Sequence, residues 1–323
     1  MSGQKTCSVH EFKHHERKEK SMTSEKKKAK NFTDDDLNEK TDVLLHSPSY
    51  TMAYEDELFM QGEDARELRL LSEYLKAESA FNHKHILSTI IVFGSARILP
   101  PDRAAKVLAE AQAEVEKNPD SAKALAGVSK AKEKVELSHY YEMAREFAEI
   151  VSEHNQIYDM ADNPDRVKYL DYVVCTGGGP GIMEAANRGA ADAGGISIGL
   201  NIALPFEQRP NPFITPDLCF QYHYFAIRKL HFMMKARALV VFPGGFGTFD
   251  ELFEGLTLRQ TGRMQALPII MFGEKFWRTC INFEYLVETG MISAKDLDLF
   301  TFVETPQDAW DAIREFYLKK KEK

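Results

Sequence analysis

Residues 238–251 read ALVVFPGGFGTFDE, and this stretch decides the fold. Its apolar, β-branched start ends at a Pro-Gly-Gly break, and a helical pattern begins at about Phe249. The pattern predicts a buried strand, a tight turn and the N-terminus of a helix. Gly244, Gly245 and Gly247 allow the backbone to approach a ligand closely, and free N–H groups at a helix start suit an anion such as phosphate. We therefore expect a phosphate site at the end of a buried strand.

A second glycine-rich turn lies upstream of this stretch. Residues 171–176 are mostly apolar, residues 177–181 read GGGPG, and a helix is expected from Ile182 to Ala193. The turn is not G-x-G-x-x-G, because residue 182 is isoleucine, and it is not a P-loop, because no Gly-Lys-Ser/Thr follows. The motifs therefore do not favour NAD or ATP. Two helix N-termini of this kind can converge on one anionic ligand.

The remaining apolar runs predict a layered α/β fold. Residues 88–97 read STIIVFGSAR, and an all-apolar run that ends in Gly-Ser is typical of the first strand of a doubly wound sheet. We expect a Rossmann-like, mainly parallel sheet of about seven strands flanked by helices. Ligands of such sheets gather at the carboxyl ends of the strands, so Gly94 and Ser95 are expected to line the pocket. The other strands are expected near residues 171–176, 197–200, 218–222, 238–242, 267–272 and 300–303, and the later helices near 224–235, 249–261, 276–289 and 305–318.

Composition along the chain predicts three segments and one insertion. Residues 1–50 are polar and of mixed charge, which is typical of a disordered or loosely docked tail. Residues 51–85 show a helical period and are expected to pack on the core that residues 86–323 form. Residues 101–155 are rich in Ala, Glu and Lys and are expected to form a helical insertion, broken into two helices at Asn118-Pro119-Asp120.

The overall composition is that of an ordinary globular protein, with 44% hydrophobic and 28% charged residues. A net charge of −8 gives no argument for nucleic acid or an anionic membrane as a partner. The four cysteines are scattered, and His10, His14 and His15 lack a partnering pattern, so no metal site is expected. No apolar run approaches the roughly 18 residues of a membrane span, and no signal-peptide core is present. We expect a cytoplasmic protein that needs no cofactor.

Residues 243–251 fit the pattern PGGxGTxxE. With this motif the chain resembles the LOG (Lonely Guy) family of phosphoribohydrolases, whose members were long mislabelled lysine decarboxylases. The pair Arg228-Lys229 and the block TGGGPGIME at residues 176–184 match the family as well. The resemblance covers about residues 89–316 and implies that Arg228 and Glu251 form the catalytic pair. It also implies a homodimer or a larger homo-oligomer.

The resemblance implies hydrolysis of the N-glycosidic bond of a nucleoside 5′-monophosphate, which gives free base and ribose 5-phosphate. The base could be adenine, an N6-substituted adenine, or a broader range of purines and pyrimidines. The resemblance also places Arg97 near the substrate. The alternative is that Arg97 forms only an ion pair at the surface. Beside Gly94 and Ser95, the residues expected to contact the substrate are Gly244, Gly245, Gly247 and Thr248 at the phosphate, Gly178, Gly179 and Gly181 on the other side of the ribose phosphate, and Glu184 at the ribose hydroxyls.

Structural interpretations of the same residues remain open at this point. Thr248 and Glu251 fit S/T-x-x-E, a capping box that would place Glu251 in the first turn of the helix. A non-catalytic nucleotide-binding or cofactor-carrier protein of the same superfamily is the alternative function, although binding alone does not require Arg228. A lysine decarboxylase would need a Schiff-base lysine, and nothing in the sequence marks Lys229 or Lys235 as one.

Overall fold

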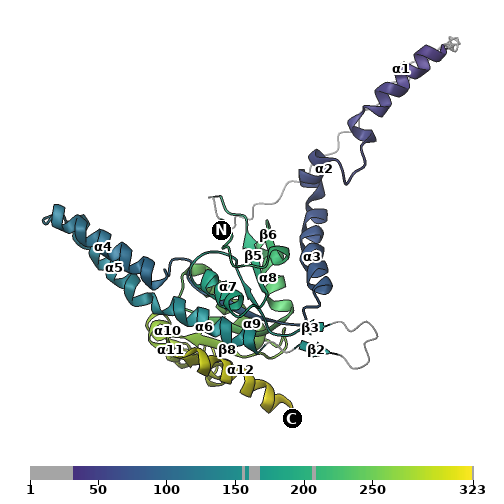
Figure 1. The fold of residues 1–323 in the computed structure, drawn as a ribbon. Helices are drawn as coiled ribbons and strands as arrows, with labels where there is room; N and C mark the ends of the chain where they lie inside the picture. The colour runs from purple at the N-terminus through teal and green to yellow at the C-terminus, as the bar shows by residue number, and fades with distance from the viewer. Residues whose placement is uncertain (1–31, 155–156, 160–167, 206–208, 322–323) are drawn as a thin grey trace, which may run out of the picture. The chain divides into compact units, whose positions relative to one another are not determined.

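The computed structural model of the protein describes residues 32–154, 157–159, 168–205 and 209–321. His10, His14 and His15 of the predicted tail lie outside the described residues. The chain divides into a first unit, residues 1–60, and a second unit, residues 61–323, and each is described by itself (Figure 1). Among the described residues, no helix combines the length and the apolar composition that crossing a membrane requires.

The described part of the first unit is mainly one polar helix, α1 (Asp34–Leu45). Its N-terminus is fixed by a capping box, in which the Thr33 hydroxyl accepts from the backbone N–H of Asp36 and the Asp36 carboxylate accepts from the backbone N–H of Thr33. No residue of α1 is buried. The cap explains why a helix forms inside a stretch whose composition predicts a loosely ordered tail. The 3₁₀ turn η1 (Pro48–Tyr50) and the short helix α2 (Glu57–Gln61) follow.

The second unit is built on a seven-stranded sheet with the order β6-β5-β4-β1-β7-β8-β9. All neighbouring strands pair in parallel, which confirms the predicted doubly wound fold. The chain moves outward from β1 to one edge and then restarts at β7 on the other side of β1. The switch point lies between β1 and β7, where such sheets bind ligands. The strands are β1 (Thr89–Phe93), β4 (Val173–Thr176), β5 (Ser197–Ile202), β6 (Cys219–Tyr222), β7 (Ala236–Val241), β8 (Ile269–Phe272) and β9 (Phe300–Val303).

Helices cover both faces of the sheet (Figure 1). Alternate residues of β1 point to opposite faces, so Ile90 and Val92 join one buried cluster while Ile91 and Phe93 join the other. The first face packs against α6 (His139–Glu153), α7 (Ile182–Asp192) and α12 (Pro306–Lys321). The second face packs against α3 (Arg66–His83), α8 (Phe225–Met234), α9 (Phe246–Gln260), α10 (Glu274–Cys280) and α11 (Phe283–Glu288). The smaller elements are η2 (Glu63–Ala65), η3 (Pro216–Leu218), η4 (Ala294–Leu299) and the antiparallel pair β2 (Ile157–Asp159) and β3 (Lys168–Leu170).

The break predicted at Asn118-Pro119-Asp120 is confirmed, but residues 101–153 form three helices instead of two. α4 (Pro101–Lys117) and α5 (Ala122–Leu137) lie side by side as a hairpin, and α5 ends at Ser138. The backbone N–H and the hydroxyl of Ser138 both donate to the carbonyl of Val135, which closes α5. α6 follows directly after Ser138, whose backbone keeps right-handed helical angles, and buries large side chains such as Tyr141 against the sheet. The crossover between β1 and β4 therefore consists of α6 preceded by a hairpin.

The single helix predicted near residues 276–289 is also wrong. This segment forms two short helices, α10 and α11, because Ile281 between them adopts an extended backbone conformation. Asn282 then caps α11 by accepting from the backbone N–H of Tyr285.

Candidate active site

The turn after β7 leads into α9 without a side-chain cap. Gly245 is the N-cap, and the helix begins at Phe246, three residues before the predicted start. Thr248 is therefore the third residue of α9, and Glu251 is the sixth. The capping-box interpretation is wrong, because neither side chain lies at a position that can cap this helix. Glu251 projects from the second turn and is free for another role.

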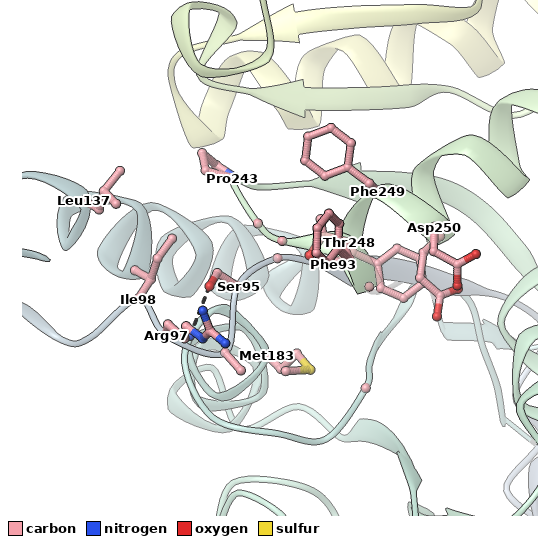
Figure 2. Close-up of a pocket in the computed structure, with 18 of the residues that line it drawn as sticks. Phe93, Ser95, Arg97, Ile98, Leu137, Met183, Pro243, Thr248, Phe249 and Asp250 are labelled. Atoms are coloured by element: carbon pink, nitrogen blue, oxygen red, sulfur yellow. Dashed lines mark hydrogen bonds between the residues drawn. The ribbon is translucent and has the colours of Figure 1, made fainter. Parts of the chain in front are cut away.

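A cavity of about 960 Å³ lies at the carboxyl ends of β1 and β7 (Figure 2). Its position is the switch point of the sheet, where the helix N-terminus of α9 contributes unpaired backbone N–H groups. The predicted residues that line it are Gly94, Ser95, Arg97, Arg228, Gly244, Gly245, Gly247, Thr248 and Glu251. The other lining residues are Phe93, Ala96, Ile98, Glu133, Lys134, Leu137, Gly177, Met183, Phe225, Pro243, Phe246, Phe249, Asp250 and Phe276.

Gly178, Gly179, Gly181 and Glu184 do not line this cavity. A Cβ on Gly178 would lie 2.4 Å from Oδ1 of Asn201, and Gly178 has a φ of 73°, so this glycine serves the turn itself. A Cβ on Gly181 would likewise meet backbone atoms of the turn after β1. Glu184 lies on α7, where its carboxylate accepts a hydrogen bond of 2.9 Å from the Tyr141 hydroxyl of α6.

Gly177 also belongs to the cavity wall, although the sequence analysis did not single it out. It directly follows β4 and lines the cavity, and a Cβ placed on it would lie 2.6 Å from Nη2 of Arg228. Only a glycine leaves room for the guanidinium at this point. The feature of the sequence that could have marked Gly177 is its place as the first residue after a buried strand, because ligands gather at the carboxyl ends of parallel strands.

Arg228 is held on three sides. Its Nε donates a 2.7 Å hydrogen bond to the carbonyl of Leu200 at β5, and its guanidinium lies 5.1 Å from the ring centroid of Phe232. Its Nη1 lies 3.8 Å from Oε1 of Glu251. The side chains of Arg228 and Glu251 are only 12% and 7% exposed, so the pair is largely shielded from water. A guanidinium fixed in this way orients the carboxylate beside it.

Burial raises the pKa of Glu251 to about 7, although the charges of Arg228 and Lys229 lower it in part. Its Oε2 is buried and has no hydrogen-bond partner among the described residues. Burial lowers the pKa of Arg228, and the charge of Glu251 partly offsets that effect. A buried carboxyl group that titrates near neutral pH and belongs to the wall of a cavity is typical of catalytic acids and bases.

This pKa predicts a pH-dependent effect on stability. Between about pH 4.5 and pH 7 the folded protein keeps a proton on Glu251 that the unfolded chain releases. The free energy of unfolding therefore falls as the pH rises across this range, and the contribution of the neutral carboxyl group is lost as the pH passes 7. We expect Glu251→Gln to raise the free energy of unfolding by up to about 3 kcal/mol at pH 8 and by little at pH 5. Urea unfolding of both proteins at the two pH values measures this. A change of equal size at both values would contradict the assignment.

Comparison with known proteins shows similarity over part of the chain. Residues 183–313 match the model of a protein family described as possible lysine decarboxylase. Over 118 residues the chain is 32% identical to the pyrimidine/purine nucleotide 5′-monophosphate nucleosidase of Escherichia coli K12. Over 155 residues it is 24% identical to a probable cytokinin riboside 5′-monophosphate phosphoribohydrolase of the LOG type from Oryza sativa subsp. japonica. In this region the chain is similar to proteins of the LOG family.

The matches to these relatives cover only part of each chain. The match to the Escherichia coli protein covers 32% of this chain and 24% of that protein, so the chain spans about a quarter of its length. The rice match covers 45% of this chain and 68% of the relative. Among solved structures, the Moco carrier protein from Chlamydomonas reinhardtii aligns over 56% of this chain and 89% of its own, with 19% identity and a TM-score of 0.37.

The description of the matching family model raises lysine decarboxylation again, and the two candidate lysines do not support it. Lys229 forms ion pairs of 2.8 Å with Asp250 and 3.0 Å with Glu254, and Lys235 lies 3.4 Å from Glu78. Neither lysine lines the cavity. A Schiff-base lysine must reach the bound cofactor, so these residues do not fit that role.

Proposed function

We propose that this protein hydrolyses the N-glycosidic bond of nucleoside 5′-monophosphates and gives free base and ribose 5-phosphate. The observation that carries the proposal is the buried Arg228–Glu251 pair, which lines the same cavity as the N-terminus of α9. One end of the site suits a phosphate, and a carboxylate one turn further along the same helix suits the reacting sugar. The names of the relatives agree with this substrate class.

The 5′-phosphate binds at the start of α9 in this proposal. The backbone N–H groups of the first turn have no partners inside the helix, and the helix dipole favours an anion there. Space beside the Cα atoms of Gly245 and Gly247 is open, so the phosphate can approach the backbone. The Thr248 hydroxyl adds a side-chain donor. Gly178, Gly179 and Gly181 shape the facing turn, and contact of Glu184 with the ribose stays a prediction.

The chemistry follows from the position of the carboxylate. Cleavage of the bond between C1′ and the base nitrogen leaves positive charge on the sugar, and the electron pair departs with the base. Glu251 offsets that charge and accepts a proton from the water that attacks C1′, while Arg228 holds the carboxylate in place. The proton then passes to the leaving base. A general base with a pKa of about 7 matches neutral conditions, so kcat/KM is expected to rise with pH through this value.

A panel of nucleoside 5′-monophosphates tests the proposed reaction. We expect the purified protein to release free base from AMP or a related nucleotide, and to act far more weakly on adenosine, because the phosphate supplies binding energy remote from the reacting bond. Chromatography of the released bases measures this and ranks adenine, N6-substituted adenine and the other bases. Tight binding of the whole panel without any base release would instead favour the non-catalytic binding protein.

We also propose that the protein acts as a homo-oligomer. Large apolar side chains of α8 and the first turns of α9 are exposed beside the cavity, namely Phe225, Leu230, Met234, Phe246 and Phe253. Several large apolar side chains exposed close together are typical of protein interfaces. Light scattering of the purified chain measures the subunit number, and a monomer at working concentration would contradict this part of the proposal.

A further inference from the structure

The helix that carries Arg228 has no cap of its own. Tyr224 is the N-cap of α8, and its side chain makes no capping hydrogen bond. Arg228 is the fourth residue of this helix, and its backbone N–H donates a 3.2 Å hydrogen bond to the carbonyl of Tyr224. That bond closes the first turn of α8, so the place of the Arg228 backbone depends on how firmly Tyr224 is held.

The helix α3, which lies beside α8, supplies the missing cap (Figure 1). One carboxylate oxygen of Glu73 accepts a 2.7 Å hydrogen bond from the backbone N–H of His223, and the other accepts a 3.2 Å hydrogen bond from that of Tyr224. A carboxylate in this place is also favoured by the helix dipole. Arg69, one turn earlier on α3, donates from its Nε to the Tyr224 hydroxyl at 3.3 Å. Tyr224 is therefore held through its backbone and through its side chain.

The same helix also holds the other end of α8. Nε2 of His231 lies 3.1 Å from the carbonyl oxygen of Tyr74, and the two rings stack with their centroids 5.3 Å apart. Lys235, the C-cap of α8, lies 3.4 Å from Glu78. Because these contacts fix the end of α8 away from Tyr224, loss of the Glu73 carboxylate loosens the first turn without releasing the helix.

We propose that Glu73 is a positioning residue for the reaction, because it caps α8 from α3 and so holds the Arg228 guanidinium beside Glu251. The inference rests on the proposed function. It adds an element that lies outside residues 183–313, the part of the chain that matches the family model. Glu73 does not line the cavity, so it acts through Arg228. Nη1 of Arg228 lies 3.8 Å from Oε1 of Glu251, and a displacement of about 1 Å at such a pair is costly in rate.

Replacement of Glu73 in the full-length chain tests this assignment, with Glu67→Ala as the matched control. Glu67 is exposed on the same helix, and within the described part of the chain its carboxylate forms no hydrogen bond or ion pair. We expect Glu73→Ala to lower kcat for base release from AMP about tenfold. KM and the affinity for ribose 5-phosphate should change by less than about twofold, because the proposed phosphate site lies on α9. Glu73→Gln keeps one acceptor oxygen and should fall between Glu73→Ala and wild type, whereas Glu67→Ala should match wild type.

The pH dependence separates a displaced guanidinium from a weakened fold. Burial raises the pKa of Glu251, and the charge of Arg228 lowers it in part. The other charged groups that act on this carboxyl are Lys229, Glu254 and Asp250. A shift of Arg228 away from Glu251 raises that pKa further, so the midpoint of kcat/KM against pH should move upward in Glu73→Ala. An NMR titration of the Glu251 carboxyl carbon measures the same change without turnover.

Each outcome decides the assignment. A cooperatively folded Glu73→Ala protein with the kcat of Glu67→Ala overturns it, and so does a fall in kcat with an unchanged pH midpoint. If Glu73→Ala does not fold, the same measurements on Glu73→Gln decide. A wild-type protein that releases no base from any nucleotide contradicts the proposed hydrolysis alone. The NMR titration then still tests Glu73, because a raised pKa of Glu251 in the variant supports the positioning role and an unchanged pKa overturns it.

Discussion

Glu251→Gln is expected to lower kcat for base release from AMP by about 10³-fold. Glutamine keeps the size of the side chain but cannot accept the proton of the attacking water or offset charge on the sugar. Because Glu251 does not cap α9 and its Oε2 has no partner among the described residues, the substitution removes no structural hydrogen bond that the structure records there. Steady-state assays on wild type and variant at pH 8 measure the loss.

The matched control for this variant is Glu254→Gln on the same helix. Glu254 does not line the cavity and faces Lys229 at 3.0 Å, so its replacement should leave kcat within about threefold of wild type. The Glu251→Gln protein should still bind ribose 5-phosphate, because the phosphate contacts lie in the first turn of α9. More than a tenth of wild-type activity in Glu251→Gln would show that another group activates the water.

Gly177→Ala is expected to lower kcat by about 10²-fold although it replaces neither Arg228 nor Glu251. The added methyl group would lie 2.6 Å from Nη2 of Arg228 and 2.8 Å from Sδ of Met183, so the guanidinium must shift. A displacement of this order at a catalytic pair costs about a hundredfold in rate, because orientation is lost. Unlike Gly178 and Gly181, Gly177 does not have a positive φ, so alanine fits its backbone.

Gly127→Ala gives the control for this substitution. Gly127 lies inside α5, and a Cβ there meets no atom within 4 Å, so the variant should keep full activity and gain slight helix stability. Thermal unfolding of Gly177→Ala separates a shifted guanidinium from a damaged fold. A cooperatively folded Gly177→Ala protein with wild-type kcat would mean that the position of Arg228 does not limit the reaction.

The sequence predicts the seven-stranded sheet well, because most of its strands are short, largely apolar runs and several end at a glycine turn. β1 and β4 are buried along their whole length, which makes these runs easy to recognise. Helix boundaries are harder. α9 starts at Phe246 because Gly245 caps it, although Thr248 offers the more usual capping signal. Ser138 separates α5 from α6 without a proline or a glycine nearby, so no pattern marks the break.

The site is only partly predictable from the sequence. Glycine-rich turns after strands indicate an anion site. The pairing of Arg228 with Glu251 was expected only from the family resemblance, because the two residues lie on different helices and no local sequence pattern links them. Leu137 and Lys134 reach the cavity through the orientation of a hairpin about forty residues from the nearest motif. Contacts between distant segments depend on packing angles, which periodicity does not determine.

In the proposed reaction one cavity holds a nucleotide phosphate at the start of α9 and presents the sugar to Glu251. A crystal structure of the Glu251→Gln protein with AMP bound tests this most directly. We predict the phosphate within about 3 Å of the backbone N–H groups of the first turn of α9, and C1′ within reach of the residue 251 side chain directly or through one water. A phosphate bound elsewhere, or a ribose that faces away from residue 251, would contradict the account.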